Sequence, residues 1–309
     1  MPSATFLLPT RERFGAQRLD AELAKALGRA DRNSADGDQR ARIFDILPRG
    51  WPAAAVTRQR DAGDASIGAW LRADPAYVRP DINGACLLAC GDALALTREE
   101  AADLLRPLRP LFGDAGMPID APTPSRWYLR LPREARLPKF NGPDEALGSD
   151  LFEHLPDGPE GRRWRALLSE AQVVLHNHPA NAQRIAAGKP PVNSLWFWGA
   201  GTLPDHVVSA HTAIFSDDDT VQAFAASAGA SSLPVPARWG TAGGERLFDL
   251  RHIRDLALVQ SHWLLPALRD LRAGAVNTMT LDFADGAGFA LRSGQRWRFW
   301  RGPLRSLAA

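Results

Sequence analysis

One continuous stretch, residues 161–201, constrains the fold of this 309-residue chain more than any other. It reads GRRWRALLSEAQVVLHNHPANAQRIAAGKPPVNSLWFWGAG. The apolar residues of its first half recur with helical spacing and form a single stripe. They are Trp164, Leu167, Leu168, Ala171, Val174 and Leu175. Pro179 suits the first turn of a second helix, where a missing N–H costs nothing, and Gly188 and the following prolines end that helix.

The aromatic run that follows predicts a buried strand. Residues 195–198 (LWFW) form a short apolar run of the kind found inside sheets. Gly199 and Gly201 allow a tight turn at the carboxyl end of this strand, where open α/β sheets usually form a ligand crevice. Upstream, three polar side chains with three-residue spacing follow one broad helix face. They are His178, Asn181 and Arg184.

The compound motif HNHPANAQRIAAGKPPVNSLWFWGAG, residues 176–201, resembles a segment of archaeal-type cofactor-independent phosphoglycerate mutases. That segment reads roughly HP-x-N-x-x-R, then a glycine, then a Pro/Asn step before an aromatic strand and a Gly-x-Gly. The motif is more similar still to bacterial RpfE-type regulatory proteins. The resemblance is strong over 161–201, moderate over 66–131 and weak beyond residue 211.

The resemblance implies an α/β fold of the alkaline phosphatase superfamily, with a discontinuous core and an inserted α+β lobe. On this basis, residues 1–61 and 177–309 form the core and residues 62–176 form the inserted substrate-type lobe. Within the lobe, the apolar patterns predict strand, strand, helix and strand in that order. A capping box, Thr97 to Glu100, precedes the helix.

The resemblance also implies a ligand cleft between the two lobes. The predicted ligand-binding residues are Arg72, Asp74, His178, Asn181, Arg184 and Asn193. Arg72 would clamp a phosphate or carboxylate, or would form a local pair with Asp74 that fixes the strand end. The remaining residues would contact the ligand, or would form an internal polar network that backbone groups satisfy. The sequence leaves both interpretations open.

The mutases use two metal ions and a Ser or Thr nucleophile, and such a site needs six or more clustered Asp and His ligands. Where the family places an Asp-Gly pair after the first strand, this chain has Leu8-Pro9-Thr10. Asp205-His206 is the only Asp-His dipeptide, and it comes too early in the chain. The sequence therefore predicts a protein without the usual metal site and without a required cofactor.

The alternative is an active phosphoglycerate mutase or phosphatase with a rearranged Mn or Zn site, in which His178 is the general acid or base. Its ligands would be His211, Asp217, Asp218, Asp249 and His252. Residues 216–219 (SDDD) also match the cap and acidic first turn of a helix. Asp249 and His252 are one turn apart on a helix predicted over 248–271, a spacing found in ligand pairs and on solvated helices.

The charge balance of the chain limits which binding partners are expected. The chain has 37 basic and 35 acidic residues, a net charge of +2, so no strong overall field attracts nucleic acid or a membrane. At the C-terminal end, a three-strand meander is predicted over 278–283, 288–292 and 296–301. The arginines and aromatic rings of its last strand would stack bases or cover an edge strand, and the low net charge favours the edge strand.

The two cysteines indicate the redox state of the cellular compartment. Cys86 and Cys90 lie on one face of a predicted strand, about 13 Å apart, which is too far for a disulfide. We therefore expect free, buried thiols in a reducing compartment. The sequence shows no secretory signal pattern and no apolar run of 18 residues, so a cytoplasmic protein is expected.

Together with the resemblance, these features favour a phosphoglycerate-mutase-like regulatory protein over the alternative of an active phosphoglycerate mutase or phosphohydrolase. It would bind a small phosphorylated or carboxylated ligand, or a regulatory protein partner, in the cleft between the lobes. No nucleic acid or membrane partner is expected. The resemblance to the RpfE-type proteins further implies a role in the control of pathogenicity factors in plant-associated bacteria.

Overall fold

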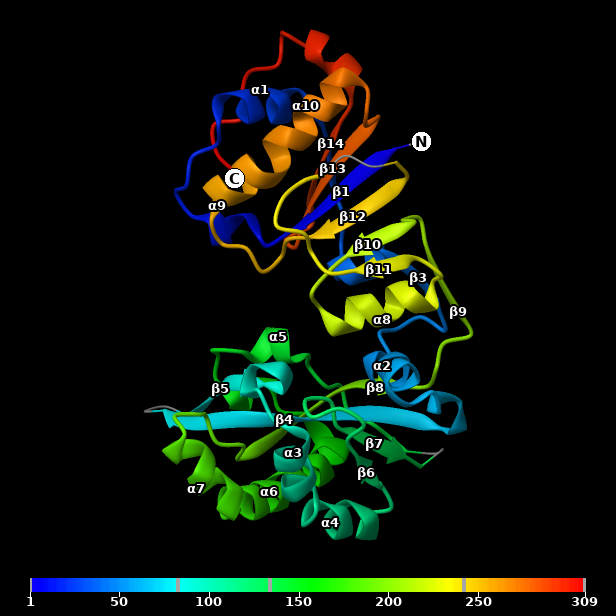
Figure 1. Cartoon of the computed structure of the whole chain (residues 1–309), viewed down its shortest axis with the longest axis vertical. Helices are drawn as coiled ribbons and strands as arrows, with labels where there is room; N and C mark the ends of the chain where they lie inside the picture. The colour runs from blue at the N-terminus through cyan, green and yellow to red at the C-terminus, as the bar shows by residue number, and fades with distance from the viewer. Residues whose placement is uncertain (1, 82–83, 133–134, 241–242, 308–309) are drawn as a thin grey trace. The chain divides into compact units, whose positions relative to one another are not determined.

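The computed structural model describes residues 2–81, 84–132, 135–240 and 243–307 (Figure 1). The backbone divides into two compact units: a core unit from residues 1–49 and 205–309, and an inserted unit from residues 50–204. The predicted α/β class, with a discontinuous core and an inserted α+β unit, is confirmed. Among the helices of the described ranges, none has the length and apolar character needed to cross a membrane.

The core unit is built on one seven-stranded sheet with the order β11-β10-β12-β1-β13-β14-β2. In chain order, its strands are β1 (Ser3–Leu8), β2 (Asp31–Ser34), β10 (Ala213–Phe215), β11 (Ser231–Leu233), β12 (Glu245–Asp249), β13 (Thr278–Phe283) and β14 (Ala287–Leu291). The strands from β11 to β13 are parallel, whereas β14 and β2 are antiparallel additions at one edge. Figure 1 shows the blue β1 between β12 and β13, so the two chain ends share one sheet.

Helices and a small second sheet complete the core unit. The helices are α1 (Ala21–Arg29), α8 (Asp219–Ser227), α9 (Leu256–Val259), a π-helical turn (Gln260–Leu264) and α10 (Leu265–Ala273). The second sheet pairs β3 (Phe44–Leu47) with β9 (His206–Ser209). Aromatic rings join sheet and helices: Phe248 stacks 5.5 Å from Phe6 and lies 5.3 Å from Trp263, measured between ring centroids. Such pairs add to the stabilisation from burial.

Two predicted elements of the core unit are wrong. The helix predicted over 248–271 starts at Leu256, because Phe248 and Asp249 extend the parallel strand β12 and Asp255 caps the helix. The meander has only two of its three strands. Residues 293–297 form a 3-10 turn, and β2 pairs with β14 instead. Long-range pairing, which local pattern does not encode, decides both cases.

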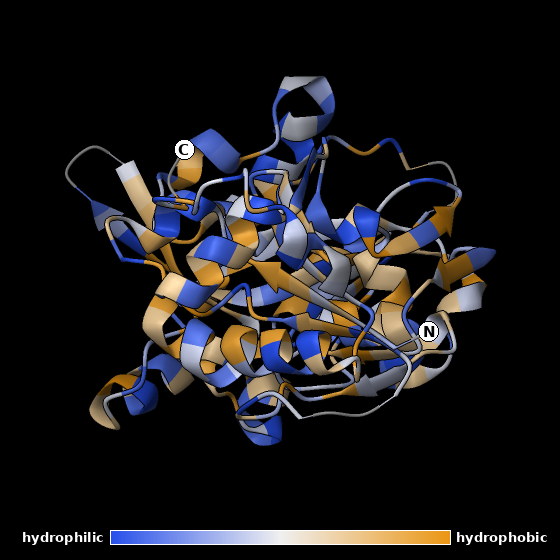
Figure 2. Ribbon diagram, turned by 90° about the horizontal axis from the view of Figure 1, so that it is seen from above, coloured by the Kyte–Doolittle hydropathy of each residue, from blue (hydrophilic) through white to orange (hydrophobic). Residues whose placement is uncertain are grey.

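The inserted unit contains an antiparallel sheet, in which β4 is the central strand and pairs with β5, β7 and β8. The strands are β4 (Ala69–Asp81), β5 (Gly84–Cys90), β6 (Ile119–Asp120), β7 (Tyr128–Leu131) and β8 (Ser194–Gly201). The helices are α2 (Ala53–Ala62), α3 (Arg98–Leu105), α4 (Leu108–Asp114), α5 (Pro143–Ala146), α6 (Gly158–His176) and α7 (Pro179–Ala186). Helices in Figure 2 alternate between hydrophilic and hydrophobic colours along their length, as amphipathic helices do.

Two of the local helix predictions for this unit agree with the structure. The α6 stripe is buried from Trp164 to Leu175, apart from a half-buried Val174. Thr97 and Glu100 form the predicted capping box of α3. Cys86 and Cys90 are not joined in a disulfide, and they are half-buried rather than fully buried.

The unit boundaries lie at 49/50 and 204/205, whereas the sequence predicts 61/62 and 176/177. The difference arises because β8 hydrogen-bonds along β4 and therefore belongs to the inserted unit. Gly199 and Gly201 lie within β8 rather than in a turn beyond it. A Cβ atom on Gly199, which has a φ of +67°, would lie 2.8 Å from the Cβ of Ala53. Glycine thus lets the start of α2 pack directly against the strand.

Candidate functional site

The carboxyl ends of the parallel strands in the core unit carry a cluster of charged side chains. Open α/β sheets usually bind ligands at this edge, because the loops that follow the strands meet there. Asp249 is the last residue of β12, Ser216 directly follows β10, and Asp282 lies near the end of β13. The register pairs Leu7 of β1 with both Asp249 and Asp282, so the three strand ends are level.

Arg251 is the centre of the first part of this cluster. Its guanidinium forms a fork with Asp249, with Nε 2.8 Å from Oδ1 and Nη2 2.6 Å from Oδ2. The same Nη2 donates to Oδ2 of Asp218 at 3.1 Å. Ser216 donates its hydroxyl proton to Asp249 at 2.7 Å and accepts the backbone N–H of Asp218. One guanidinium therefore bridges two carboxylates, and the Ser216 hydroxyl is already engaged.

The electrostatics of this group follow from its burial. Asp249 is only 4 % exposed. Burial alone would raise its pKa, but the hydrogen bonds and positive charge of Arg251 outweigh burial and hold the pKa of Asp249 below its usual value. For Arg251, burial opposes the charged form, yet the two carboxylates raise its pKa further. Both groups are charged at neutral pH.

A second set of ion pairs lies on the same edge. Arg42 forms a fork with Asp282, at 3.1 Å from Nε and 2.7 Å from Nη2, and Arg40 forms one with Asp38. Gln39 donates from Nε2 to the backbone oxygen of Asp282 at 2.6 Å. These pairs and the Arg251 group influence one another, since the charge of Arg251 acts on the pKa of both Asp38 and Arg40. The edge is thus a network of matched opposite charges.

The carboxylates at this edge do not fit a two-metal centre. A metal ion needs the same carboxylate oxygens that Arg251 and Arg42 occupy, and a guanidinium does not lose its proton. Within the described ranges, no three His, Cys, Asp or Glu side chains come together in a group suited to a metal.

The five residues predicted as ligands of a rearranged metal site contact protein groups or solvent instead. His211 contacts the Thr5 hydroxyl through Nε2 at 3.1 Å, and Asp217 accepts the backbone N–H of Val235. Asp218 caps α8 and also binds Arg251. Asp249 is the strand-end partner of Arg251, and His252 is an exposed residue in the turn that follows. Asp249 and His252 are not one turn apart on a helix, because the helix that follows β12 begins at Leu256.

In the inserted unit, Arg72 and Asp74 form a buried ion pair. Both lie on β4, with Arg72 Nε 2.8 Å from Asp74 Oδ1, and they are 3 % and 2 % exposed. Asp74 also accepts the indole N–H of Trp198 at 2.7 Å, and the Arg72 guanidinium lies 4.9 Å from the centre of that ring. This arrangement corresponds to the local Arg–Asp pair, one of the two interpretations left open by the sequence.

The other four predicted ligand residues bind protein groups in the inserted unit. His178 accepts the backbone N–H of Ala180 and caps α7. Asn181 exchanges two hydrogen bonds with the backbone of Val192, and Asn193 does the same with Val78 on β4. These contacts fix the loop between α7 and β8 to the sheet.

Arg184 is the most enclosed member of the set, at 1 % exposure. It donates to the backbone oxygens of Pro190 and Leu94 at 3.0 and 2.6 Å, and Nη1 lies 2.9 Å from a Glu100 carboxylate oxygen. The internal network is therefore present, and each predicted residue makes at least one contact within it.

Comparison with known proteins relates part of the chain to phosphoglycerate mutases. It is 35% identical over 104 residues to the probable 2,3-bisphosphoglycerate-independent phosphoglycerate mutase of Geobacter sulfurreducens, covering 32% of this chain and 26% of that protein. It is 42% identical over 62 residues to the 2,3-bisphosphoglycerate-independent phosphoglycerate mutase of Methanosarcina barkeri, covering 20% and 16%. About a third of this chain thus matches about a quarter of the first relative, and no family model matches.

Two solved structures are similar in outline. The cofactor-independent phosphoglycerate mutase from Thermoplasma acidophilum is 14% identical with a TM-score of 0.34, over 94% of this chain and 89% of that chain. The PH0037 protein from Pyrococcus horikoshii is 13% identical with a TM-score of 0.43, over 94% and 87%. The relationship to the mutases is carried by the partial sequence matches.

Sequence reasoning did not identify Arg251, Arg42 or Gln39. The available signal was the spacing Asp249-Leu250-Arg251, which places an acid and a base two residues apart at the end of an apolar run. Had residues 245–249 been recognised as a strand, this spacing would have indicated a charge pair at its carboxyl end.

Proposed function

We propose that this protein is a relative of the phosphoglycerate mutases that acts by binding, in a regulatory role, rather than by metal-dependent phosphoryl transfer. The observation that carries the proposal is the fork between Arg251 and Asp249, with Asp218 as a third partner, at the ligand-binding edge of the core sheet. The positive charge of Arg251 balances the carboxylates there, as a bound cation would otherwise do.

Energetics favour the arginine over a metal ion at this edge. A divalent cation would have to displace Arg251 from a carboxylate that is 4 % exposed. Displacement would leave a permanently charged guanidinium without its main partners, and separating a buried pair costs about 3–5 kcal/mol. Ser216 also lacks the freedom of a nucleophile, since it is fully buried and hydrogen-bonded to Asp249.

The proposed ligand is a small phosphorylated or carboxylated molecule, with a regulatory protein partner as the second option. The partial sequence match to the mutases supports phosphoglycerates as the first compounds to test. Cytoplasmic residence is also part of the proposal, supported by two cysteines that are not joined in a disulfide, as expected in a reducing compartment.

Metal content and mutase activity test the proposal together. Purified protein, expressed with added Mn²⁺ and Zn²⁺, is measured by inductively coupled plasma mass spectrometry and assayed for conversion of 3-phosphoglycerate to 2-phosphoglycerate. We expect less than one metal equivalent per chain and no conversion, while calorimetric titration with 3-phosphoglycerate reports binding without turnover. Two metal equivalents together with turnover would establish the alternative, an active mutase with a rearranged metal site.

A further inference from the structure

The end of the core unit concentrates positive charge that the whole chain lacks. Residues 292–305, RSGQRWRFWRGPLR, contain five arginines and no acidic residue. Residues 29–32, RADR, add two arginines and Asp31, so the two segments together carry 5 + 2 − 1 = +6. The whole chain carries +2, which leaves −4 for the rest. The charge is therefore strongly localised on one part of the core unit.

The same segment exposes three large aromatic side chains. Trp297, Phe299 and Trp300 are 65%, 78% and 71% exposed, the highest values for large hydrophobic residues in the described ranges. Phe299 and Trp300 are edge-to-face, with ring centroids 5.6 Å apart, and the guanidinium of Arg296 lies 5.0 Å from the Trp297 ring centre. Clustered exposed rings of this kind mark interaction surfaces.

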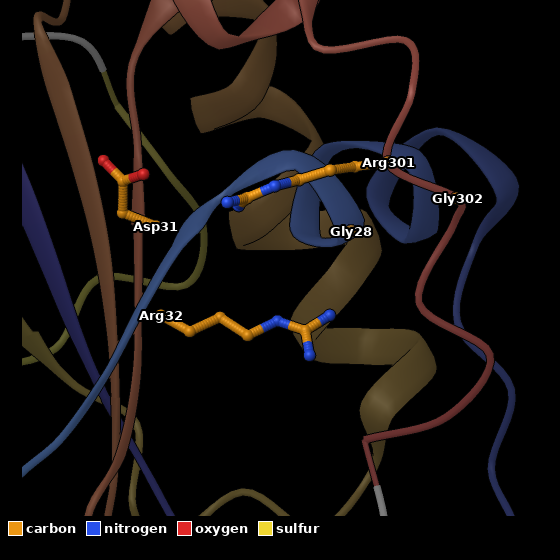
Figure 3. A pocket seen from close by; sticks show the side chains of 5 residues that line it. All are labelled: Gly28, Asp31, Arg32, Arg301 and Gly302. Carbon is orange, nitrogen blue, oxygen red and sulfur yellow. The ribbon is translucent and has the colours of Figure 1, made fainter.

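A pocket of about 550 Å³ is lined in part by the residues that directly follow Trp300 in the chain (Figure 3). Gly28, Asp31, Arg32, Arg301 and Gly302 line it. Figure 3 shows the side chains of Arg32 and Arg301 extending across the same opening from two different segments of the chain. A Cβ atom on Gly28 would lie 2.1 Å from the backbone oxygen of Gly302, so glycine allows the close approach of the two segments there.

The charges that face this pocket favour an anion. Among the described residues that line it, Asp31 is the acidic one, and it is paired with Arg298 and Arg292. The hydrogen bond from Arg298 is the main reason that the pKa of Asp31 is lowered. Arg301 donates one N–H to the backbone oxygen of Ala30 at 2.9 Å, which fixes its side chain in the wall. Within the part of the chain that the structure describes, no hydrogen bond or ion pair engages the Arg32 guanidinium, which lies 5.8 Å from the Phe289 ring centre.

We propose that this surface binds single-stranded nucleic acid. A backbone phosphate would occupy the pocket between Arg32 and Arg301, and bases would stack on Trp300 and Phe299. Because Trp300 directly precedes Arg301, the ring and the pocket are within the span of about one nucleotide. Arginine grooves beside exposed rings are the usual means of binding single strands without sequence preference.

The sequence analysis predicts no nucleic acid partner, and two observations explain why this proposal differs. The net charge of +2 averages the positive segment with an acidic remainder, so it conceals the local field. The sequence pattern favours an edge strand for these rings, whereas they lie in and after a 3-10 turn and stay exposed. A concave pocket for a single phosphate, in addition to the rings, favours nucleic acid over a flat anionic membrane.

Fluorescence anisotropy with labelled 12-nucleotide dT and U strands tests the proposal on the full chain. We expect binding at 50 mM NaCl that weakens at 200 mM, because phosphate contacts release counterions. Trp300→Ala should weaken binding about 5- to 150-fold, the range for loss of one stacked base. Arg32→Ala should also weaken binding and should reduce the log–log salt slope by about 0.7.

Matched controls come from the inserted unit. Phe152→Ala removes a 62% exposed ring, and Arg162→Ala removes an exposed arginine; both should bind like the unmodified protein. If Trp300→Ala fails to fold by circular dichroism, Phe299→Ala replaces it, since that ring is 78% exposed.

Several results would overturn the proposal. They are no binding of either strand at 50 mM NaCl, a mononucleotide that binds as tightly as the 12-mer, and equal effects of the surface and control variants. Preferential binding to phosphatidylserine vesicles would identify a membrane surface instead. A dimer in sedimentation that Trp300→Ala dissociates would identify a second copy of the chain as the occupant.

Discussion

Replacing Arg251 with alanine is the perturbation that bears most directly on the charged edge of the core sheet. The side chains of Arg251 and Asp249 are 21% and 5% exposed, so the pair is largely shielded from solvent. Arg251→Ala leaves Asp249 buried with the Ser216 hydroxyl as its remaining side-chain donor. Breaking such a pair from one side should lower the free energy of unfolding by about 3 kcal/mol at pH 7.5.

The pH dependence of this effect identifies its cause. In the unmodified protein, the pKa of Asp249 is lowered, so its stabilising contribution is present above the ordinary aspartate pKa and is lost as the pH falls through the lowered value. In Arg251→Ala, burial without the guanidinium raises the pKa of Asp249 instead. The carboxyl group then protonates as the pH falls from 7 toward 4, and the difference between the two proteins should shrink.

Urea unfolding followed by tryptophan fluorescence and circular dichroism measures the effect. The double variant Arg251→Ala/Asp249→Asn, which removes the unpaired charge, should recover much of the loss. Arg106→Ala is the matched control, because its pair with Asp103 is 79% and 55% exposed and should contribute under about 1 kcal/mol. The reasoning is refuted if Arg251→Ala unfolds like the unmodified protein, or if its loss persists unchanged at pH 4 and in the double variant.

Three further predictions concern the packing of each unit. Arg184→Ala should destabilise the protein by about 3 kcal/mol in urea, because it removes buried hydrogen bonds and the nearer of the two cations beside Glu100. Weaker binding of 3-phosphoglycerate at unchanged stability would instead mean that Arg184 contacts a ligand. Gly199→Ala should lower the free energy of unfolding by about 1–3 kcal/mol, because of its positive φ and its contact with α2. The control Gly113→Ala, whose new Cβ would have no neighbouring atom within 4 Å, should not lower it. Equal melting temperatures for the two variants would contradict this prediction. Burial lowers the pKa of His211, so the folded protein should lose stability as the pH falls below about 6.5, and His211→Gln should remove that part of the pH dependence; an unchanged profile would show that another group is responsible.

Local sequence pattern predicted the parts of the fold that depend on neighbouring residues. The α6 stripe and the capping box at Thr97 follow from spacing along one helix, and both are present. Which of the segments 31–34 and 296–301 forms a strand depends on which one pairs with β14. Pairing partners far apart in the chain leave no local signature. The position of β8 in the inserted unit is a result of the same kind.

The candidate site was less predictable than the fold. Individual acids such as Asp218 and Asp249 were identified from the sequence as possible ligands. Their common partner, Arg251, was not, because it reaches Asp218 only when β10 and β12 lie side by side. Charge networks of this kind depend on tertiary arrangement, and residue type and spacing do not distinguish a carboxylate that binds a metal from one that binds a guanidinium.

The central claim is that arginine side chains, rather than metal ions, balance the carboxylates at the carboxyl edge of the core sheet. A crystal of the protein soaked in Mn²⁺, with anomalous diffraction collected at the manganese absorption edge, tests it most directly. We expect no anomalous peak within coordination distance of the Asp249 and Asp218 carboxylates, and Arg251 in contact with both. A pair of peaks about 4 Å apart at those carboxylates, with Arg251 displaced, would contradict the claim.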